Sequence, residues 1–345
     1  MNLNRPDLSQ VAPDVRSYIE ALEAELDRLR GQASRPAQRE PSLEPSEPPT
    51  TLNVITVSQS GLAKRTPRHL YSRQRRAGMG IFDLETPQDD PPAHLVVVDE
   101  AQDLLILTDQ ARVFRVPVSD LPESPVRSRG QNLNERLPLH PGETIAIILP
   151  RQTQGYLVLV SQTGQVRRLR HHLFRELLGP GTAVYDIREM GPPAVGCWTS
   201  GEDELFIASR QGRAIRFAEQ QVPAKGCLGL RLDPDDAVVA VTGVRPESGV
   251  FLLSADGKGI IREMSGFSPN KAPGSGGKVA LKTDHLAGAL AVAPEADLFI
   301  ISRLSKIIRF QAVEVSTTEG VVQGVHCIGL RSDEVVAVTG SQPGG

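Results

Sequence analysis

The chain has 345 residues, of which 39% are hydrophobic and 4% aromatic, and its 38 Lys and Arg against 41 Asp and Glu give a formal net charge of −3. This length suffices for two average domains or one large repeat array. A charge so close to balance does not by itself indicate a nucleic-acid-binding protein, so that function would have to rest on where the charges lie.

The cysteines and the apolar runs narrow the class of protein further. Cys197, Cys227 and Cys327 are too few for a disulfide framework and form no Cys-x-x-Cys pair, which favours a reducing compartment and argues against a zinc site. The sequence shows no signal peptide and no run of about 18 apolar residues. We expect a soluble cytoplasmic protein without a membrane partner, a metal or a cofactor.

Residues 1–31 are predicted to contain a short amphipathic α-helix. Within "PDVRSYIEALEAELDRLR" (13–30), apolar residues recur in steps of four and three and so form one helical stripe. Its members are Val15, Ile19, Leu22, Leu26 and Leu29. A helix this short is marginal alone in water. Either it pairs with a second copy as a coiled coil, making a homodimer, or its stripe docks on the body of the protein.

Residues 32–50 are predicted to be a disordered linker. Their sequence, "QASRPAQREPSLEPSEPPT", contains five prolines and a single bulky apolar residue, Leu43. Such a composition favours a semi-extended tether that buries no core. It separates the helix from everything that follows.

Residues 51–345 repeat one pattern six times. Each copy has an apolar strand, a polar turn and a second strand with basic residues, as in "GYLVLVSQTGQVRRL" from Gly155 and "DELFIASRQGRAIRF" from Asp203. The turn positions, about 50 residues apart, are Gly61, Ala111, Gly164, Gly212, Gly257 and Ser305. The second halves repeat too, because "CLGLRLDPDDAVVAVTG" (227–243) matches "CIGLRSDEVVAVTG" (327–340). The pattern predicts an all-β array, closed or spiral.

This array resembles the C-terminal domain family of the DNA gyrase A and topoisomerase IV C subunits. The stretch "VSDLPESPVRSRGQNLNERLPLHPGETIAIILP" (118–150) is the closest, and residues 74–80, "QRRAGMG", resemble the family's gyrase-A box, Gln-Arg-Arg-Gly-Gly-Lys-Gly. The residues that match the box are Gln74, Arg75, Arg76, Gly78 and Gly80, whereas Ala77 and Met79 depart from it. The resemblance implies a six-bladed β-pinwheel, a propeller-like fold that binds and bends duplex DNA around its rim.

A series of basic residues supports DNA binding independently of the resemblance. An arginine stands four residues after each turn position, or five after it in the fifth repeat, and Lys64 precedes the first. The series is Arg65, Arg115, Arg168, Arg216, Arg262 and Arg309. Around a ring, these residues would form a belt that follows a curved phosphate backbone, with the box glycines letting backbone N–H groups approach phosphates. Alternatively, duplication has left the arginines as inherited, solvated side chains.

No catalytic function is predicted. The resemblance places the nucleophilic tyrosine of type IIA enzymes in a breakage-reunion domain that this sequence does not contain, and "GSGGKV" (274–279) lacks the spacing of an ATP-binding loop. We therefore expect a stand-alone, non-catalytic module that binds and bends duplex DNA at the nucleoid. The alternative is a protein scaffold that docks a topoisomerase or another partner, since residues 51–345 carry 32 basic and 32 acidic side chains.

Overall fold

The computed structural model describes residues 12, 14–20, 22–23, 47–175 and 178–341, and it divides into two compact units, Met1–Glu44 and Pro45–Gly345. In the first unit, residues 14–20 and 22–23 are helical, and Val15 and Leu22 are exposed. The rest of the predicted helix and residues 32–46 of the predicted linker lie outside the described residues. Glu47 belongs with the second unit, where its carboxylate bonds to Arg68 and Arg309.

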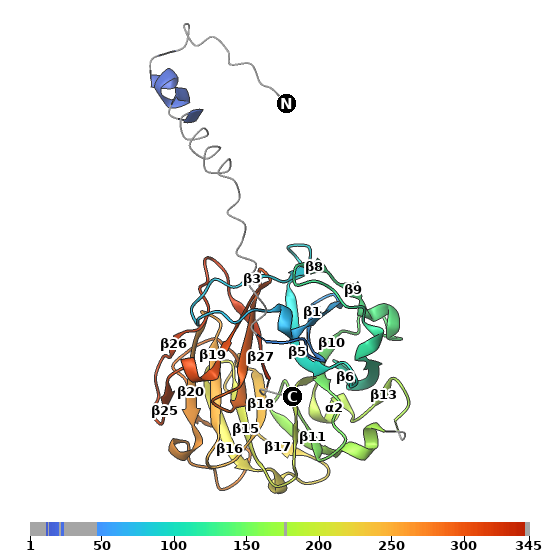
Figure 1. Cartoon of the computed structure of the whole chain (residues 1–345). Coiled ribbons are helices and arrows are strands. Elements are labelled where there is room, and N and C mark those ends of the chain that lie inside the picture. The colour runs from blue at the N-terminus through green and yellow to red at the C-terminus, as the bar shows by residue number, and fades with distance from the viewer. Residues whose placement is uncertain (1–11, 13, 21, 24–46, 176–177, 342–345) are drawn as a thin grey trace. The chain divides into compact units, whose positions relative to one another are not determined.

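The second unit is built from six antiparallel β-hairpins, as the repeats predict (Figure 1). Their first strands are β1 (Leu52–Ser58), β6 (Asp103–Thr108), β11 (Tyr156–Ser161), β15 (Glu204–Ser209), β19 (Gly249–Ser254) and β23 (Asp297–Ser302). Their second strands are β2 (Leu62–Pro67), β7 (Arg112–Pro117), β12 (Gln165–Arg170), β16 (Arg213–Ala218), β20 (Lys258–Glu263) and β24 (Lys306–Gln311). All six predicted turn positions have positive φ, including Ala111 (56°) and Ser305 (60°), which shows that one turn geometry recurs.

Two further strands complete each hairpin as a four-stranded blade, and the blade of β19 and β20 has a fifth strand, β25 (Thr317–Thr318). The inner strands, which pair with the first hairpin strands, are β5 (Pro92–Asp99), β10 (Ile145–Pro150), β14 (Pro193–Thr199), β18 (Val238–Val244), β22 (Leu286–Val292) and β27 (Val335–Ser341). The outer strands, which pair with the second hairpin strands, are β9 (Gln131–Asn132), β13 (Thr182–Ala183), β17 (Cys227–Leu228), β21 (Lys278–Val279), β26 (Val325–His326) and β3 (Ile81–Phe82). We number the blades 1–6 by their hairpins.

Every outer strand belongs in sequence to the following blade. The chain leaves the hairpin of blade 2, for example, supplies β9 to blade 1, and returns to blade 2 as β10. Blade 1 in turn supplies β3 to blade 6, where Ile81 pairs with Ile307. This last exchange joins the beginning of the array to its end, so the ring is closed. In Figure 1 the blue strands of blade 1 accordingly lie beside the red strands of blade 6.

The remaining elements are short. The helical turns are η1 (Arg68–Leu70), η2 (Val118–Asp120), η3 (Leu133–Arg136), η4 (His171–Phe174), η5 (Glu219–Gln221), η6 (Met264–Gly266), η7 (Ala312–Glu314) and the α-helix α2 (Ile187–Met190). Strand β4 (Leu84–Glu85) pairs in parallel with β8 (Ser128–Arg129), and β25 (Thr317–Thr318) pairs in parallel with β20. A 3₁₀ turn therefore follows the second hairpin strand of each blade and begins the segment that crosses to the preceding blade.

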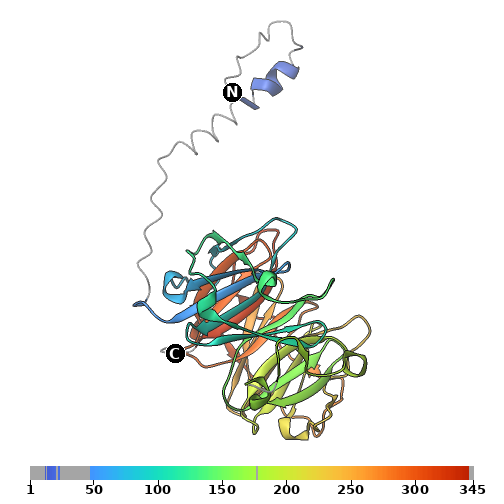
Figure 2. The ribbon, with the colours of Figure 1, turned by 90° about the vertical axis from the view of Figure 1, so that its right-hand side faces the viewer.

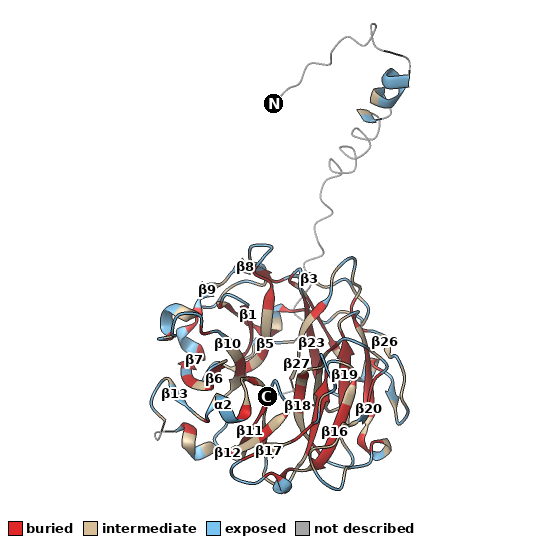
Figure 3. Ribbon diagram, turned by 180° about the vertical axis from the view of Figure 1, so that it is seen from behind, coloured by how far each residue is buried: buried red, intermediate tan, exposed pale blue. Residues whose placement is uncertain are grey.

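The hydrophobic core lies between the blades. Among the described residues, buried apolar side chains form six clusters, each shared by two neighbouring blades. The cluster between blades 6 and 1 contains Phe299 and Tyr71, and Figure 3 shows the buried residues concentrated on the hairpin and inner strands. All six inner strands line a central cavity of about 290 Å³. Figure 2 gives a view of the same sheets from the side. The all-β six-bladed prediction is confirmed.

Candidate nucleic-acid interface

The gyrase-A-like box, residues 74–80, lies at the seam where blade 1 meets blade 6. It connects η1 to β3, and its backbone runs along blade 6. The Gln74 N–H donates to the Arg309 carbonyl (2.7 Å) and the Ala77 N–H to the Cys327 carbonyl (2.8 Å). Gly80 has a φ of 69°, and a Cβ there would lie 2.8 Å from the Ile307 carbonyl oxygen. The glycine is required because the backbone approaches β24 so closely.

Most of the box amides have a partner within the protein. Besides those of Gln74 and Ala77, the Arg76 N–H donates to the Glu314 carboxylate (3.0 Å), and the Gly78 N–H donates to the Arg75 carbonyl (3.1 Å). An anion-binding concavity of free amides, as expected from the sequence, is therefore not formed by these four groups. Their hydrogen bonds hold the box against blade 6 instead.

The two arginine side chains of the box differ in their exposure. Arg75 is exposed, whereas Arg76 is half-buried and donates through Nη1 to the His326 carbonyl (3.0 Å). Next to the box, the ring of Phe82 in β3 is exposed and lies between two cations, with Arg127 at 5.7 Å and Lys306 at 5.7 Å from its centroid. The seam thus presents an exposed aromatic ring beside two basic side chains, one of which, Arg127, also pairs with Glu85 (2.9 Å). We call these residues the Phe82 cluster.

Five of the predicted belt arginines occupy the same place in their blades. Each is the fourth residue of the second hairpin strand; we call this set the strut arginines: Arg65, Arg115, Arg168, Arg216 and Arg309. Four of them bond to carbonyls in the 3₁₀ turn, or the residue just after it, of the following blade. Arg216, for example, donates to the Met264 and Phe267 carbonyls at either end of η6 (2.6 and 2.9 Å). The shared position therefore serves contacts between blades.

Burial separates the predicted belt into two groups. Lys64, Arg216, Arg262 and Arg309 are all at least 95% buried. Lys64 pairs with Asp83, and Arg309 pairs with both Asp297 and Glu47, so these charges are neutralised inside the protein. A DNA phosphate cannot reach them without unfolding the blade interface. These four residues are therefore not the surface contacts that the sequence predicts but buried residues of the fold. The following blade covers Arg216 and Arg309. Lys64 and Arg262 are buried on the opposite faces of their own blades.

Arg262 differs from the strut arginines in its direction. It is the fifth residue of β20, so its side chain points to the opposite face of the blade. There it packs over the Phe267 ring, and burial lowers the pKa of its guanidinium. Three arginines of the predicted belt remain. Arg115 is exposed, while the side chains of Arg65 and Arg168 are 11% and 17% exposed.

Exposed basic residues that the repeat alignment missed lie on the segments that cross between blades. We call these the crossover segments: 71–91, 121–144, 175–192, 222–237, 267–285 and 315–334. Their exposed basic residues include Arg127, Arg129, Arg175, Lys225, Lys271 and Lys278. They hold no fixed distance from the turn positions, so aligning the hairpins does not reveal them. Counting the Lys and Arg of the stretches between the hairpins would have revealed them.

The last crossover segment breaks this series. Residues 315–334 supply the outer strand of blade 5, and their only Lys or Arg is Arg331 near the end. Glu319 lies at the middle of the same segment, and Glu314 precedes it. Each of the other five crossover segments therefore supplies at least two Lys or Arg to an outer edge, whereas the segment on blade 5 supplies one.

Two other kinds of site receive no support from the described part of the chain. No three His, Cys, Asp or Glu side chains among the described residues are grouped so that they could hold a metal ion. Within the same residues, no helix has the length and apolar character needed to cross a lipid bilayer.

Comparison with known proteins finds one family. The family model described as "DNA gyrase C-terminal domain, beta-propeller" matches residues 52–90, 102–149 and 203–244. The DNA gyrase A protein of Mycolicibacterium smegmatis is 30% identical over 303 residues, covering 83% of this chain and 36% of that protein. The corresponding protein of Ureaplasma parvum is 30% identical over 295 residues, covering 82% and 35%. The chain thus spans about a third of the length of these relatives.

Solved structures agree with this fold. A DNA gyrase A C-terminal domain superimposes with a TM-score of 0.75 at 21% identity, covering 84% of this chain and 99% of that domain. The C-terminal domain of a DNA topoisomerase IV gives a TM-score of 0.55 at 18% identity, covering 84% and 93%. At these identities the likeness concerns the arrangement of the blades.

Proposed function

Because the chain belongs to the family of DNA gyrase C-terminal domains, we propose that it binds duplex DNA along the outer edge of its ring and bends it. The contacts are made by the exposed basic residues of the crossover segments, with Arg75 and the Phe82 cluster at the seam of blades 6 and 1. Arg115 contributes from the predicted belt. Such contacts attract phosphates without reading bases, so binding is independent of sequence.

The distribution of charge supports bending that stops short of a full turn. Five outer edges carry at least two exposed Lys or Arg each, whereas the crossover segment on blade 5 has Arg331 alone, together with Glu319. A duplex that follows the positive edge therefore enters and leaves beside blade 5. Bending a few tens of base pairs costs a few kcal/mol, which several phosphate contacts can offset.

We propose no catalytic step for this chain. Its matched relatives are named as DNA gyrase A proteins, and it corresponds to the C-terminal domain of such a protein. Its role is then to shape DNA at the nucleoid for a topoisomerase that performs the cleavage. A preparation of this chain alone is expected to leave supercoiled plasmid unrelaxed, and relaxation without added topoisomerase would contradict this.

The N-terminal helix is proposed to join two copies of the chain. Val15 and Leu22 are exposed apolar residues of that helix, and Arg16 and Glu20 form an ion pair (3.5 Å) one turn apart. The dimer would raise avidity for DNA, because each ring is carried on its own tether. Light scattering should give a dimer mass that falls to the monomer in Leu22→Asp, whereas an unchanged mass would exclude this contact.

Salt-dependent binding tests the DNA proposal. A fluorescent duplex of about 40 base pairs would be titrated with the full chain at several salt concentrations. The double variant Arg75→Ala, Arg129→Ala is expected to bind more weakly, with the slope of log K against log salt reduced by about 2, one for each lost phosphate contact. Both residues are exposed, so the fold is retained.

Arg245→Ala is the matched control. Arg245 is equally an exposed arginine, but it lies between β18 and β19, outside the crossover segments. The Arg245→Ala variant should leave the slope of log K against log salt unchanged. Equal effects of the control and the double variant would place the DNA elsewhere, and no binding at low salt would favour a protein scaffold over a DNA-binding module.

A further inference from the structure

Blade 5 lacks the strut arginine that the other five blades possess. The fourth residue of β20 is Ile261, which pairs with Phe251 just as Arg309 pairs with Phe299 and Arg216 with Phe206. Ile261 therefore stands where a guanidinium would otherwise reach the 3₁₀ turn of blade 6. The carbonyls equivalent to those that Arg216 binds belong to Ala312 and Val315, the two ends of η7.

The acidic partner of the strut is missing from the same blade. Arg115, Arg216 and Arg309 pair with the first residue of their own hairpin, which is Asp103, Glu204 and Asp297 respectively. In blade 5 that residue is Gly249. Both members of the ion pair are therefore replaced, one by an apolar side chain and the other by no side chain at all.

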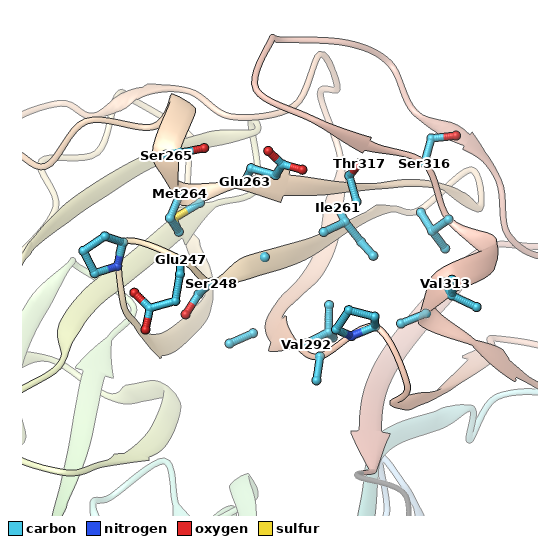
Figure 4. A pocket seen from close by; sticks show the side chains of 17 residues that line it. Glu247, Ser248, Ile261, Glu263, Met264, Ser265, Val292, Val313, Ser316 and Thr317 are labelled. Carbon is cyan, nitrogen blue, oxygen red and sulfur yellow. The ribbon is translucent and has the colours of Figure 1, made fainter.

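A pocket occupies the resulting space between blades 5 and 6. Its volume is about 840 Å³, within the range of ligand-binding pockets. Gly249, Ile261, Ala312 and Val315 all line it. Figure 4 shows Ile261 pointing from β20 into the space that Ser248, Val292 and Val313 border on the other sides. The pocket lies where the missing pair would have been.

Two acidic side chains make the pocket suitable for a cation. Glu247 and Glu263 line it, and neither forms an ion pair with any described residue. The other lining residues are mostly apolar, with Val313 67% exposed at the rim. An arginine offers both properties that this lining requires, an aliphatic stem and a planar cation with several donors.

We propose that this pocket binds an arginine-containing, apolar segment of a partner protein. The guanidinium of the partner takes the place of the absent strut arginine, donating to the carbonyls at the ends of η7 and facing Glu247 and Glu263. The flanking apolar residues pack on Ile261, Val292 and Val313. The site is distinct from the basic residues of the crossover segments, so the partner and DNA can be held together.

A labelled peptide tests this assignment. The probe is a fluorescein-labelled, terminally blocked Val-Arg-Val-Leu peptide, compared with the same peptide carrying citrulline, which keeps the shape of arginine without its charge. Binding to the full chain is followed by fluorescence anisotropy. The arginine peptide should bind about tenfold more tightly or better, because its hydrogen bonds are charge-assisted.

Two variants of the chain complete the test. Gly249→Asp with Ile261→Arg rebuilds the ion pair of blades 2 and 6. A Cβ on Gly249 would clash with the Cγ2 of Ile261 (2.7 Å), which arginine lacks, and would otherwise lie in ordinary contact with the Val292 carbonyl oxygen (3.8 Å). This refilled chain should lose peptide binding and retain DNA binding. The double variant Glu247→Gln, Glu263→Gln keeps the shape of the pocket but removes its two negative charges. It should reduce the ratio of the affinities for the arginine and citrulline peptides.

The proposal is overturned by any of three results. These are no binding of the arginine peptide at millimolar concentration, equal binding of the citrulline peptide, and undiminished binding to the refilled chain. If the refilled chain does not fold, the glutamine variant provides the test. An unchanged preference of that variant for the arginine peptide would also exclude the site. Duplex binding by the same samples reports separately on the DNA proposal.

Discussion

The strut arginines share a residue type and a position, yet their surroundings differ. Arg115 is half exposed, and its pair with Asp103 (3.6 Å) faces solvent. Arg216 is buried, and its guanidinium bonds at once to Glu204 through Nε and to two carbonyls of blade 5 through Nη1. A guanidinium is suited to such a place because it stays charged and donates in several directions. The degree of burial depends on the turn that the next blade places over it.

Alanine substitutions of Arg216 and Arg115 should show how much more a buried strut arginine stabilises the fold than an exposed one. Arg216→Ala removes the guanidinium from the Glu204 carboxylate and the Phe267 carbonyl at a buried interface, while the Met264 carbonyl keeps the Phe267 N–H. We therefore expect the free energy of unfolding to fall by about 3–5 kcal/mol. Arg115→Ala breaks an exposed pair and should cost less than about 1 kcal/mol. Urea unfolding of both variants measures the difference. Similar losses would show that Arg216 is not the interblade contact that its geometry indicates.

At the scale of elements, the exchange of outer strands decides how the blades are joined. Each outer strand has only two residues and so forms few hydrogen bonds. At the seam, β3 is aided by the box, whose Gln74 and Ala77 amides bond to blade 6. The positive φ of Gly80 lets the chain pass from the box into β3 against β24. The pairing of β3 with blade 6 therefore depends on a short segment around one glycine, and the buried cluster with Phe299 and Tyr71 joins the same two blades.

Gly80→Val should loosen this closure. Its Cβ would lie 2.8 Å from the Ile307 carbonyl oxygen, and valine strongly disfavours the positive φ of that position. We expect β3 to leave β24, with faster hydrogen exchange at residues 81–82 and 306–307. Gly276→Val is the control, because its Cβ would approach a single atom, the Arg231 carbonyl oxygen, at 3.9 Å. Unchanged exchange at the seam in Gly80→Val would mean that closure does not depend on β3.

At the scale of the whole molecule, the closed ring creates an interior that no single blade possesses. The central cavity is lined by small and branched apolar residues from all six inner strands, with His94 as the polar side chain among its lining residues. Burial lowers the pKa of His94 to about 4 from its ordinary 6.5. The neutral imidazole is thus the form that the assembled ring accommodates.

His94 should make the stability of the ring depend on pH. Between about 6.5 and 4 the unfolded chain binds a proton that the folded chain does not, so stability is complete above pH 6.5 and falls as the pH drops through this window. Glu47 and Glu143 have lowered pKa values and therefore weaken the fold only below about 4.5. Urea unfolding from pH 7 to 5 should show the loss, and His94→Leu should abolish it. An equal loss in His94→Leu would assign the effect to other groups.

The six hairpins, their turn positions and the all-β class follow from the residue pattern alone. These features depend on contacts between residues close in the chain, on strand alternation and on a turn that needs positive φ, and such local requirements are visible in the residue pattern. The box was located differently, by the resemblance of residues 74–80 to the family's Gln-Arg-Arg-Gly-Gly-Lys-Gly motif.

Only the tertiary structure decided which arginines are buried, how the ring closes and where a pocket opens. A basic residue on a hairpin looks the same in sequence whether the next blade covers it, as with Arg309, or leaves it exposed, as with Arg115. The replacement of an arginine by Ile261 becomes meaningful only when blade 6 is placed beside it. Burial and cavities arise from surfaces that meet across long separations in the chain, and a local pattern does not contain that information.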